Sequence, residues 1–200
     1  MLTRNRSDDD KARVRKAMLE AASELLIERG YDGLTLAEVG KRVGFTTTNV
    51  YRYFDNKNDL IYAAIEDAFV AFGERLEAAK QSTEDPFERI FALGRAYVQF
   101  AVDHPAPYYL MFVEKTDYLF GEREVPGVDK LGYLFEAVGE AMHAGAIRPG
   151  NIETTAHVLW GQLHGILMLT DAMPFIHRVQ GEEAIEEAFA MMRLSLKSEY

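Results

Sequence analysis

The sequence predicts an all-α protein with a small N-terminal head and a larger helical body. Apolar residues recur at spacings of three and four along most of the 200-residue chain, as on one face of an amphipathic helix. No run keeps the alternation of apolar and polar residues that is typical of a strand, and no segment repeats. Gly and Pro residues divide the pattern into roughly nine helices, the first three of which form the head.

The first helix is predicted to begin after a polar arm and to pack against the rest of the head. Ser7 or one of the three Asp residues behind it can cap the helix. Val14, Met18 and Leu25 fall on one apolar face, and Gly30 is placed to end the helix.

A helix, a tight turn and a second short helix are predicted next. Thr35 and Glu38 have the spacing of a capping box, in which each side chain accepts a hydrogen bond from the other's backbone. Gly44 ends this helix and leaves room only for a tight turn. Thr46 or Thr47 can cap the second helix.

The second helix of this pair has a polar outer face. Val50 and Phe54 are four residues apart and point inward together. Opposite them lie hydroxyl, amide, phenol and guanidinium groups that can contact DNA bases and phosphates, on Thr47, Thr48, Asn49, Tyr51 and Arg52. The capping box, the Gly turn and this face together favour a helix-turn-helix motif over a purely packing role.

A long connecting helix follows, and a domain boundary is predicted behind it. Asn56 and Asp59 supply its cap signal. The polar stretch 81–86 ends in Asp-Pro, a typical helix start. The expected parts are a DNA-binding domain over residues 1–56, a connecting helix over 57–80 and a body over 81–200.

The body reads as helix throughout. Breaks fall at His104-Pro105, in a loop over 121–127 and in a turn over 145–150. The predicted helices cover residues 86–103, 107–113, 128–144, 152–173 and 182–197.

Composition and charge exclude several classes of protein. The chain is 48% hydrophobic and has no Cys, so it can bury a core but has no disulfide framework or thiolate metal site. It shows no N-terminal apolar run, and its most apolar segment, 158–170, is broken by Gln162 and His164, so a cytoplasmic protein that spans no membrane is expected. Up to Asn58 the chain has eleven Lys and Arg and nine Asp and Glu, or +2, so the remainder carries −12, which gives the net charge of −10.

The head closely resembles the DNA-binding domain of the TetR family of transcriptional regulators. The resemblance rests on T-L-A-E-V-G from Thr35 and on V-G-F-T-T-T-N-V-Y-R-Y-F-D-N-K-N-D-L from Val43. In the body, His104 to Phe112 and W-G-Q-L-H-G from Trp160 look like a subgroup of TetR-like C-terminal domains named for a W-x-x-x-H-G pattern.

The resemblance implies a ligand-responsive homodimer that binds palindromic operator DNA, most simply as a repressor. Its two reading helices would enter successive major grooves about 34–36 Å apart, and effector binding in the body would change that spacing. It also makes Lys57 a phosphate contact. The predicted DNA-binding residues are Thr35, Thr46, Thr47, Thr48, Asn49, Tyr51, Arg52 and Lys57.

An excess of aromatic residues in the body predicts a largely apolar cavity for a small, mainly apolar or aromatic effector. His104, Tyr108 and His164 are the few polar groups that would orient it. Packing without a cavity explains the same residues. The predicted effector-binding residues are Tyr97, Phe100, His104, Tyr108, Phe112, Trp160, His164 and Met168.

Apolar stripes on the last two helices predict a four-helix dimer interface. The alternative is that the same residues form the core of a single chain. The predicted interface residues are Ala156, Leu159, Leu163, Ile166, Ile185, Phe189 and Met192.

Two other classes of function are considered. An enzyme could pair His104 with His164, but the sequence has no Gly-rich phosphate loop, H-E-x-x-H motif or Ser elbow. No metal or other cofactor is expected, because His157 and His164 lie two helical turns apart, about 10 Å along the axis. A helical adaptor that binds proteins would not need the polar face of the second helix beside a basic arm.

Overall fold

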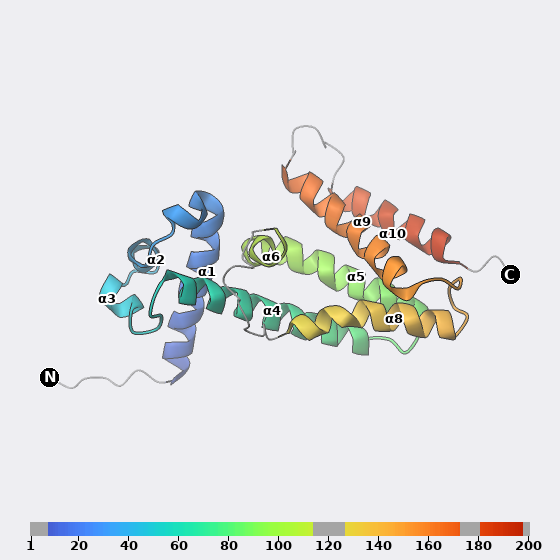
Figure 1. Ribbon diagram of the computed structural model, residues 1–200, viewed down its shortest axis with the longest axis horizontal. Helices are drawn as coiled ribbons and strands as arrows, with labels where there is room; N and C mark the ends of the chain where they lie inside the picture. The colour runs from blue at the N-terminus through green and yellow to red at the C-terminus, as the bar shows by residue number, and fades with distance from the viewer. Residues whose placement is uncertain (1–7, 114–126, 173–180, 198–200) are drawn as a thin grey trace. The chain divides into compact units, whose positions relative to one another are not determined.

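The computed structural model describes residues 8–113, 127–172 and 181–197, and within these ranges it is all-helical, as the sequence predicts. The expected cap at Ser7, most of the loop over 121–127 and Met173 at the end of a predicted helix lie outside the described residues. The elements, shown in Figure 1, are α1 (Asp8–Gly33), α2 (Leu36–Arg42), α3 (Thr47–Val50), α4 (Lys57–Gln81), α5 (Pro86–Asp103), α6 (Pro105–Phe112), the 3-10 helix η1 (Val128–Leu131), α8 (Gly132–His143), α9 (Ile152–Ala172) and α10 (Gly181–Leu196).

The helix-start caps are confirmed at four positions, but Glu38, the second member of the predicted capping box, accepts a hydrogen bond from the Arg29 guanidinium instead (3.0 Å). The Thr35 hydroxyl accepts from the Glu38 N–H (3.2 Å), and the Thr46 hydroxyl accepts from the Asn49 N–H (3.3 Å). The Asn56 and Asp85 side chains likewise accept from backbone N–H groups in the first turns of α4 and α5. Each bond satisfies a donor that the start of a helix would otherwise leave unpaired.

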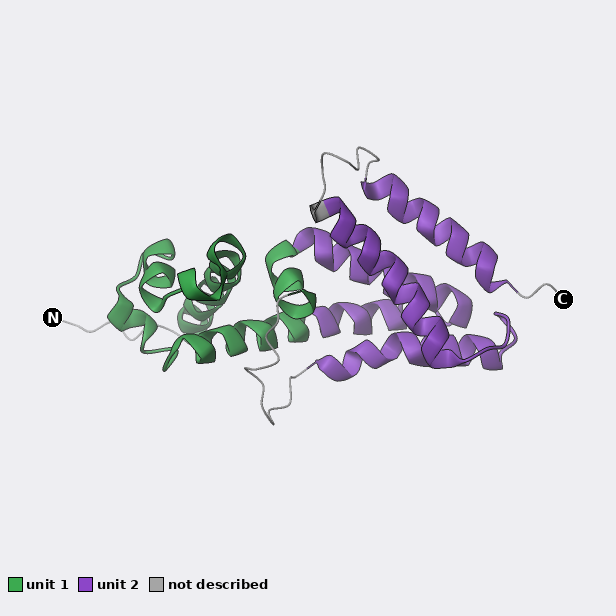
Figure 2. Cartoon of the chain, turned by 45° about the horizontal axis from the view of Figure 1, so that its top comes forward, with its two compact units in different colours: residues 1–71, 104–126 green, residues 72–103, 127–200 purple. Residues whose placement is uncertain are grey.

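The chain divides into two compact units (Figure 2). The first unit contains residues 1–71 and 104–126, and the second contains 72–103 and 127–200. The division falls inside α4, whereas the sequence analysis placed a boundary at 81–86. Because α4 is one continuous helix, its composition gives no sign of a division within it. Helix α6 belongs to the first unit, where it packs against α1 and where Phe112 meets Phe69 of α4, with ring centroids 6.0 Å apart.

The core of the first unit is built from inward-facing residues of its first helices. At Gly30 the chain takes a positive φ of 67°, a conformation that favours glycine, and α1 kinks there. Met18, Val39, Val50 and Phe54 are almost completely buried. The inward positions of α1, α2 and α3 therefore meet in one core.

The second unit packs α5, α8, α9 and α10 around buried aromatic residues. Phe91 and Phe100 of α5 are almost completely buried. Arg193 of α10 donates both terminal guanidinium nitrogens to Glu88, each at 2.7 Å, and its guanidinium carbon lies 3.9 Å from the centroid of the Phe91 ring. This bidentate pair ties α10 to α5 and lowers the pKa of Glu88.

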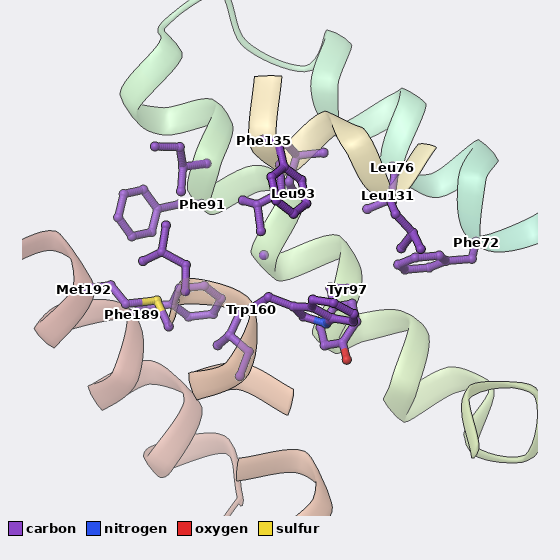
Figure 3. A pocket seen from close by; sticks show the side chains of 15 residues that line it. Phe72, Leu76, Phe91, Leu93, Tyr97, Leu131, Phe135, Trp160, Phe189 and Met192 are labelled. Carbon is purple, nitrogen blue, oxygen red and sulfur yellow. The ribbon is translucent and has the colours of Figure 1, made fainter. Parts of the chain in front are cut away.

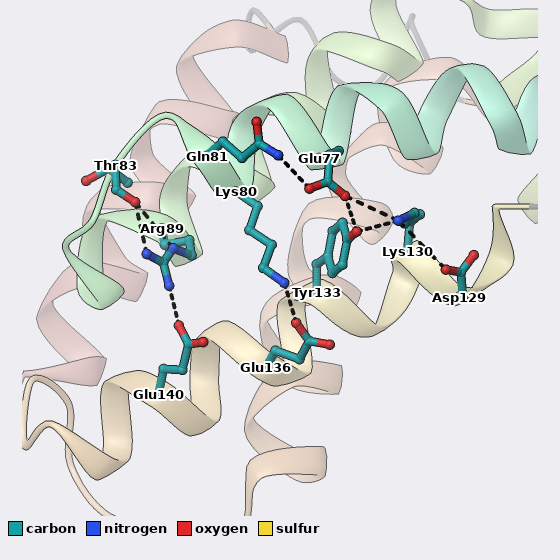
Figure 4. A network of polar contacts seen from close by, with 10 residues as sticks. All are labelled: Glu77, Lys80, Gln81, Thr83, Arg89, Asp129, Lys130, Tyr133, Glu136 and Glu140. Atoms are coloured by element: carbon teal, nitrogen blue, oxygen red, sulfur yellow. Dashed lines mark hydrogen bonds and ion pairs between the residues drawn. The ribbon is translucent and has the colours of Figure 1, made fainter.

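A polar network fixes the C-terminal half of α4 to η1 and α8 (Figure 4). The Tyr133 hydroxyl donates to Glu77, and the Lys130 ammonium donates to Glu77 (3.2 Å) and to the Tyr133 oxygen (2.6 Å). Lys80 pairs with Glu136 at 2.6 Å and lies 4.1 Å from the centroid of the Tyr133 ring. The Tyr133 hydroxyl and the Lys130 ammonium lower the pKa of Glu77, so its carboxylate stays charged.

Gly40 of α2 lies close to the turn at Phe45 and to Val50 of α3. A Cβ at Gly40 would lie 2.8 Å from the Phe45 carbonyl oxygen and 3.1 Å from Val50 Cγ2. Because a backbone atom cannot move aside easily, Gly40→Ala should lower the free energy of unfolding by about 1–3 kcal/mol, the usual cost of overpacking. The measurement is denaturant unfolding followed by circular dichroism at 222 nm.

Gly132→Ala is the matched control. Nothing lies within 4 Å of a Cβ at Gly132, whose φ is −62°. This change should leave stability unchanged or raise it slightly, by less than about 1 kcal/mol. Equal stability of the two variants would show that α2 does not pack against the turn as described.

Candidate DNA-reading face and apolar cavity

The reading segment is a short helix continued by tight turns. Helix α3 covers Thr47–Val50, and the Arg52 and Tyr53 N–H groups then donate to the carbonyls of Asn49 (3.2 Å) and Val50 (2.9 Å). Burial of Val50 and Phe54 anchors this segment from inside. Of the predicted contact residues in it, Thr48, Tyr51 and Arg52 are exposed, and Thr47 and Asn49 are half-buried.

Thr35 and Thr46 are exposed at the starts of α2 and α3, where both hydroxyl oxygens accept capping hydrogen bonds. Each hydroxyl keeps an O–H donor. A capping threonine can therefore also donate to a phosphate oxygen.

Lys57 has contacts that the sequence gave no sign of. Its ammonium donates to the Tyr31 carbonyl (2.8 Å) and lies 3.7 Å from the centroid of the Tyr31 ring. The Tyr31 hydroxyl in turn donates to Asn58 (2.6 Å). These bonds tie the first turn of α4 to the end of α1, and two further N–H donors of the ammonium are available for a phosphate.

Arg42 is occupied inside the head. It makes a bidentate pair with Glu28 (2.9 and 2.6 Å) and a further bond to Glu24 (3.2 Å), both on α1. The Arg42 guanidinium lowers the pKa of Glu28. Arg42 therefore holds α2 on α1, although it is exposed, as Lys41 and Arg52 also are.

The second unit contains an apolar cavity of about 60 Å³ (Figure 3). Side chains from α4, α5, η1, α8, α9 and α10 reach it, and aromatic rings make up much of its wall. Its lining residues are Phe72, Leu76, Ile90, Phe91, Leu93, Gly94, Tyr97, Leu131, Leu134, Phe135, Leu159, Trp160, Leu163, Phe189 and Met192.

Of the eight predicted effector-binding residues, Tyr97 and Trp160 line this cavity. Phe100 is buried in the second unit against Phe72, with ring centroids 5.0 Å apart, and Met168 is half-buried on α9. Three others, His104, Tyr108 and Phe112, belong to the first unit and do not line it. The eighth, His164, belongs to the second unit and is not part of the lining.

His164 is in hydrogen-bond contact with Tyr97. Its Nδ1 lies 2.8 Å from the Tyr97 hydroxyl oxygen. Burial lowers the pKa of His164 below its ordinary value of 6.5, so the ring is neutral at pH 7. The pair brings a polar group to the edge of an otherwise apolar wall.

The predicted dimer residues lie mostly inside the single chain. All except the half-buried Ile166 are buried there. Leu159, Leu163, Phe189 and Met192 line the cavity. The structure thus gives these residues the intrachain role that the sequence left open as the alternative. Large exposed apolar residues of α9 and α10 are instead Ile152, Val158, Leu169, Met191 and Leu194.

The part of the chain that the structure describes contains neither a metal site nor a membrane-spanning helix. No group of three or more His, Asp or Glu side chains there is arranged to hold a metal ion. None of the described helices combines the length and the apolar character that a membrane crossing needs.

Two family models match the chain. Residues 18–64 match the model described as bacterial regulatory proteins of the tetR family. Residues 90–193, more than half of the chain, match a tetracyclin repressor-like C-terminal domain. The chain belongs to the TetR family. The W-x-x-x-H-G subgroup stays a prediction.

Curated relatives agree with this membership. The nucleoid occlusion factor SlmA of Marinobacter nauticus is 31% identical over 140 residues, which cover 68% of this chain and 70% of SlmA. The HTH-type transcriptional regulator Rv1816 of Mycobacterium tuberculosis is 23% identical over 145 residues, or 70% of this chain. The match spans 62% of the length of Rv1816.

A solved structure shows the same fold. AibR in complex with isovaleryl coenzyme A and operator DNA superimposes with a TM-score of 0.73 at 22% identity, over 90% of this chain and 97% of AibR. At this identity the likeness concerns the fold alone.

Proposed function

We propose that this TetR-family chain is a ligand-responsive transcriptional regulator that binds palindromic operator DNA and releases it when a small apolar or aromatic molecule binds. The observation that carries the proposal is the exposed reading face of Thr48, Tyr51 and Arg52, which the buried Val50 and Phe54 hold in place. Hydroxyl, phenol and guanidinium groups on a fixed helix-turn-helix are suited to base edges and phosphates.

The apolar cavity supports the ligand-responsive part of the proposal. Its wall includes Phe72 and Leu76 of α4, the helix whose first turn carries Lys57. A ligand that pushes on this wall would change the position of α4 and, through it, the spacing of the two reading segments in a dimer. The neighbour AibR is described in complex with isovaleryl coenzyme A and operator DNA, so a protein of this fold can bind both a small molecule and DNA.

The exposed apolar residues of α9 and α10 are suited to a homodimer interface. Val158 and Leu169 on α9 and Met191 and Leu194 on α10 are at least 47% exposed. Val158 and Leu169 are eleven positions apart, and Met191 and Leu194 are three apart, which places each pair on a common face of its helix. Burial of these faces against a second copy would give the four-helix arrangement.

The two other functions have less support. A protein-binding adaptor would not require the exposed hydroxyl, phenol and guanidinium groups of the reading face. An enzyme using His104 and His164 has no catalytic motif in the sequence to support it.

Two single substitutions separate base reading from phosphate binding. Arg52→Ala should weaken binding to the operator by about 1–3 kcal/mol more than binding to unrelated DNA, because a bidentate contact with guanine carries sequence information. Lys57→Ala should lower affinity for both DNAs equally and reduce the slope of log affinity against log salt by about one. Fluorescence anisotropy with an operator selected from random DNA, at several salt concentrations, measures both.

Lys197→Ala is the matched charge control, because Lys197 is exposed in the second unit. It should leave affinity and salt slope unchanged. Equal losses on operator and unrelated DNA for Arg52→Ala would contradict its assignment to base reading.

If the proposed dimer interface is correct, charged substitutions in it should give a chain that is folded but monomeric. Replacing both Met191 and Leu194 with Glu should dissociate the homodimer, because it places charges in a buried apolar interface, and should abolish operator binding at nanomolar protein. Sedimentation velocity gives the oligomeric state, and circular dichroism shows that the chain is folded. Val128→Glu, at another exposed apolar residue, is the control and should remain dimeric. A folded dimer in the double variant would exclude this interface.

A further inference from the structure

An open groove lies on the outer side of α5, α9 and α10 in the second unit, with a volume of about 730 Å³. Its wall mixes apolar side chains with charged and polar ones. The lining residues are Arg95, Val98, Gln99, Val102, Leu167, Thr170, Gly181, Glu182, Ile185, Glu186 and Phe189.

Phe189 is shared by the groove and the apolar cavity. Figure 3 shows its ring among the side chains around the cavity, near Met192. On the inner side the ring meets Phe91, with centroids 6.2 Å apart. On the outer side the Arg95 guanidinium carbon lies 4.7 Å from its centroid. One ring therefore separates the two spaces.

Gly94 leaves the space in which the Phe189 ring lies. A Cβ at Gly94 would lie 2.9 Å from Phe189 Cε1 and 3.2 Å from Leu163 Cδ1. Glycine inside a helix is less favourable than alanine. The absence of a side chain at this place in α5 lets Phe189 close over the cavity.

The outer contact that covers Phe189 is weak. Arg95 pairs with Glu186 at 2.7 Å, and their side chains are 52% and 61% exposed. Exposed ion pairs contribute little to stability, so the pair can open at small cost. The cavity alone is also smaller than the pockets that hold drug-sized ligands, which span roughly 300–1,000 Å³. A ligand of that size must extend beyond Phe189.

We propose that the groove and the cavity are two compartments of one site, with Phe189 as the movable partition between them. The occupant is an amphipathic molecule whose alkyl or aryl end enters the cavity and whose polar head stays in the groove. This inference rests on the proposed ligand response and adds the class of ligand and its route.

The charges of the groove favour a cationic head. Glu182 and Glu186 face a single Arg95, and the chain as a whole has a net charge of −10. An acidic wall attracts cations and repels anions. A cationic head can also pair with Glu186 when Arg95 swings aside with Phe189.

Trp160 offers a direct readout, because it is the single Trp of the sequence and lines the cavity. The probes are octyltrimethylammonium and octanoate, which share an alkyl tail and differ in head charge. Octyltrimethylammonium should change Trp160 fluorescence with an affinity at least about fivefold higher than octanoate at low salt, and Glu182→Gln should narrow the difference.

Stopped-flow mixing tests the partition. Phe189→Ala should raise the association and dissociation rates of octyltrimethylammonium at least about tenfold, with a much smaller change in affinity. Gly94→Ala should also raise both rates, because its Cβ displaces the Phe189 ring. This variant replaces Phe189→Ala in the test if Phe189→Ala does not fold. Met192→Ala and Gly161→Ala are the controls: Met192 lines the cavity but not the groove, and a Cβ at Gly161 meets nothing within 4 Å.

The outcomes are distinct. If Met192→Ala raises the association and dissociation rates as much as Phe189→Ala does, Phe189 is not the partition. If octanoate binds more tightly than octyltrimethylammonium, the head group is not cationic. Absence of any Trp160 response to either probe would overturn the site itself. Operator binding by the same protein, measured without probe, shows separately whether the proposed DNA-binding function stands.

Discussion

Helix α4 is one unbroken run from Lys57 to Gln81, and each of its ends is fixed by different partners. At the start, the Lys57 ammonium is bonded to the Tyr31 carbonyl and lies on the Tyr31 ring. Toward the end, Glu77 is held by Tyr133 and Lys130. Exposed ion pairs are individually weak, but bonds that share partners in a network are worth more than isolated ones. The helix therefore has defined attachments at both ends.

Between these attachments, the same helix contributes Phe72 and Leu76 to the wall of the cavity. A well-packed apolar wall does not deform continuously, because side chains that interdigitate must move as a group. A ligand that has passed Phe189 and fills the cavity would therefore also displace helices. This is the physical reason for assigning the ligand response to α4 rather than to a loop.

The sequence predicted the parts of this structure that depend on neighbouring residues. The caps at Thr35, Thr46, Asn56 and Asp85 are short-range hydrogen bonds, and the inward positions Val50 and Phe54 follow from helical spacing alone. The tie between Lys57 and Tyr31 could not be predicted in this way, because it joins residues that are far apart in the chain and depends on the angle at Gly30.

The cavity depends on such long-range packing throughout. Leu163, Phe189 and Met192 form apolar stripes, but a stripe does not reveal whether it packs within one chain or against a second copy. His104, Tyr108 and Phe112 follow Phe100 closely in sequence. The break at His104 nevertheless assigns them to the other unit. Predicting the lining would have required knowing which faces of six elements converge.

On the proposed mechanism, filling the cavity weakens DNA binding. The most direct test is operator affinity, by fluorescence anisotropy, with and without whichever eight-carbon probe saturates the Trp160 signal. The saturating probe should lower operator affinity by about 5- to 150-fold, the usual range of coupling between two sites. An unchanged operator affinity at full saturation of Trp160 would contradict this mechanism.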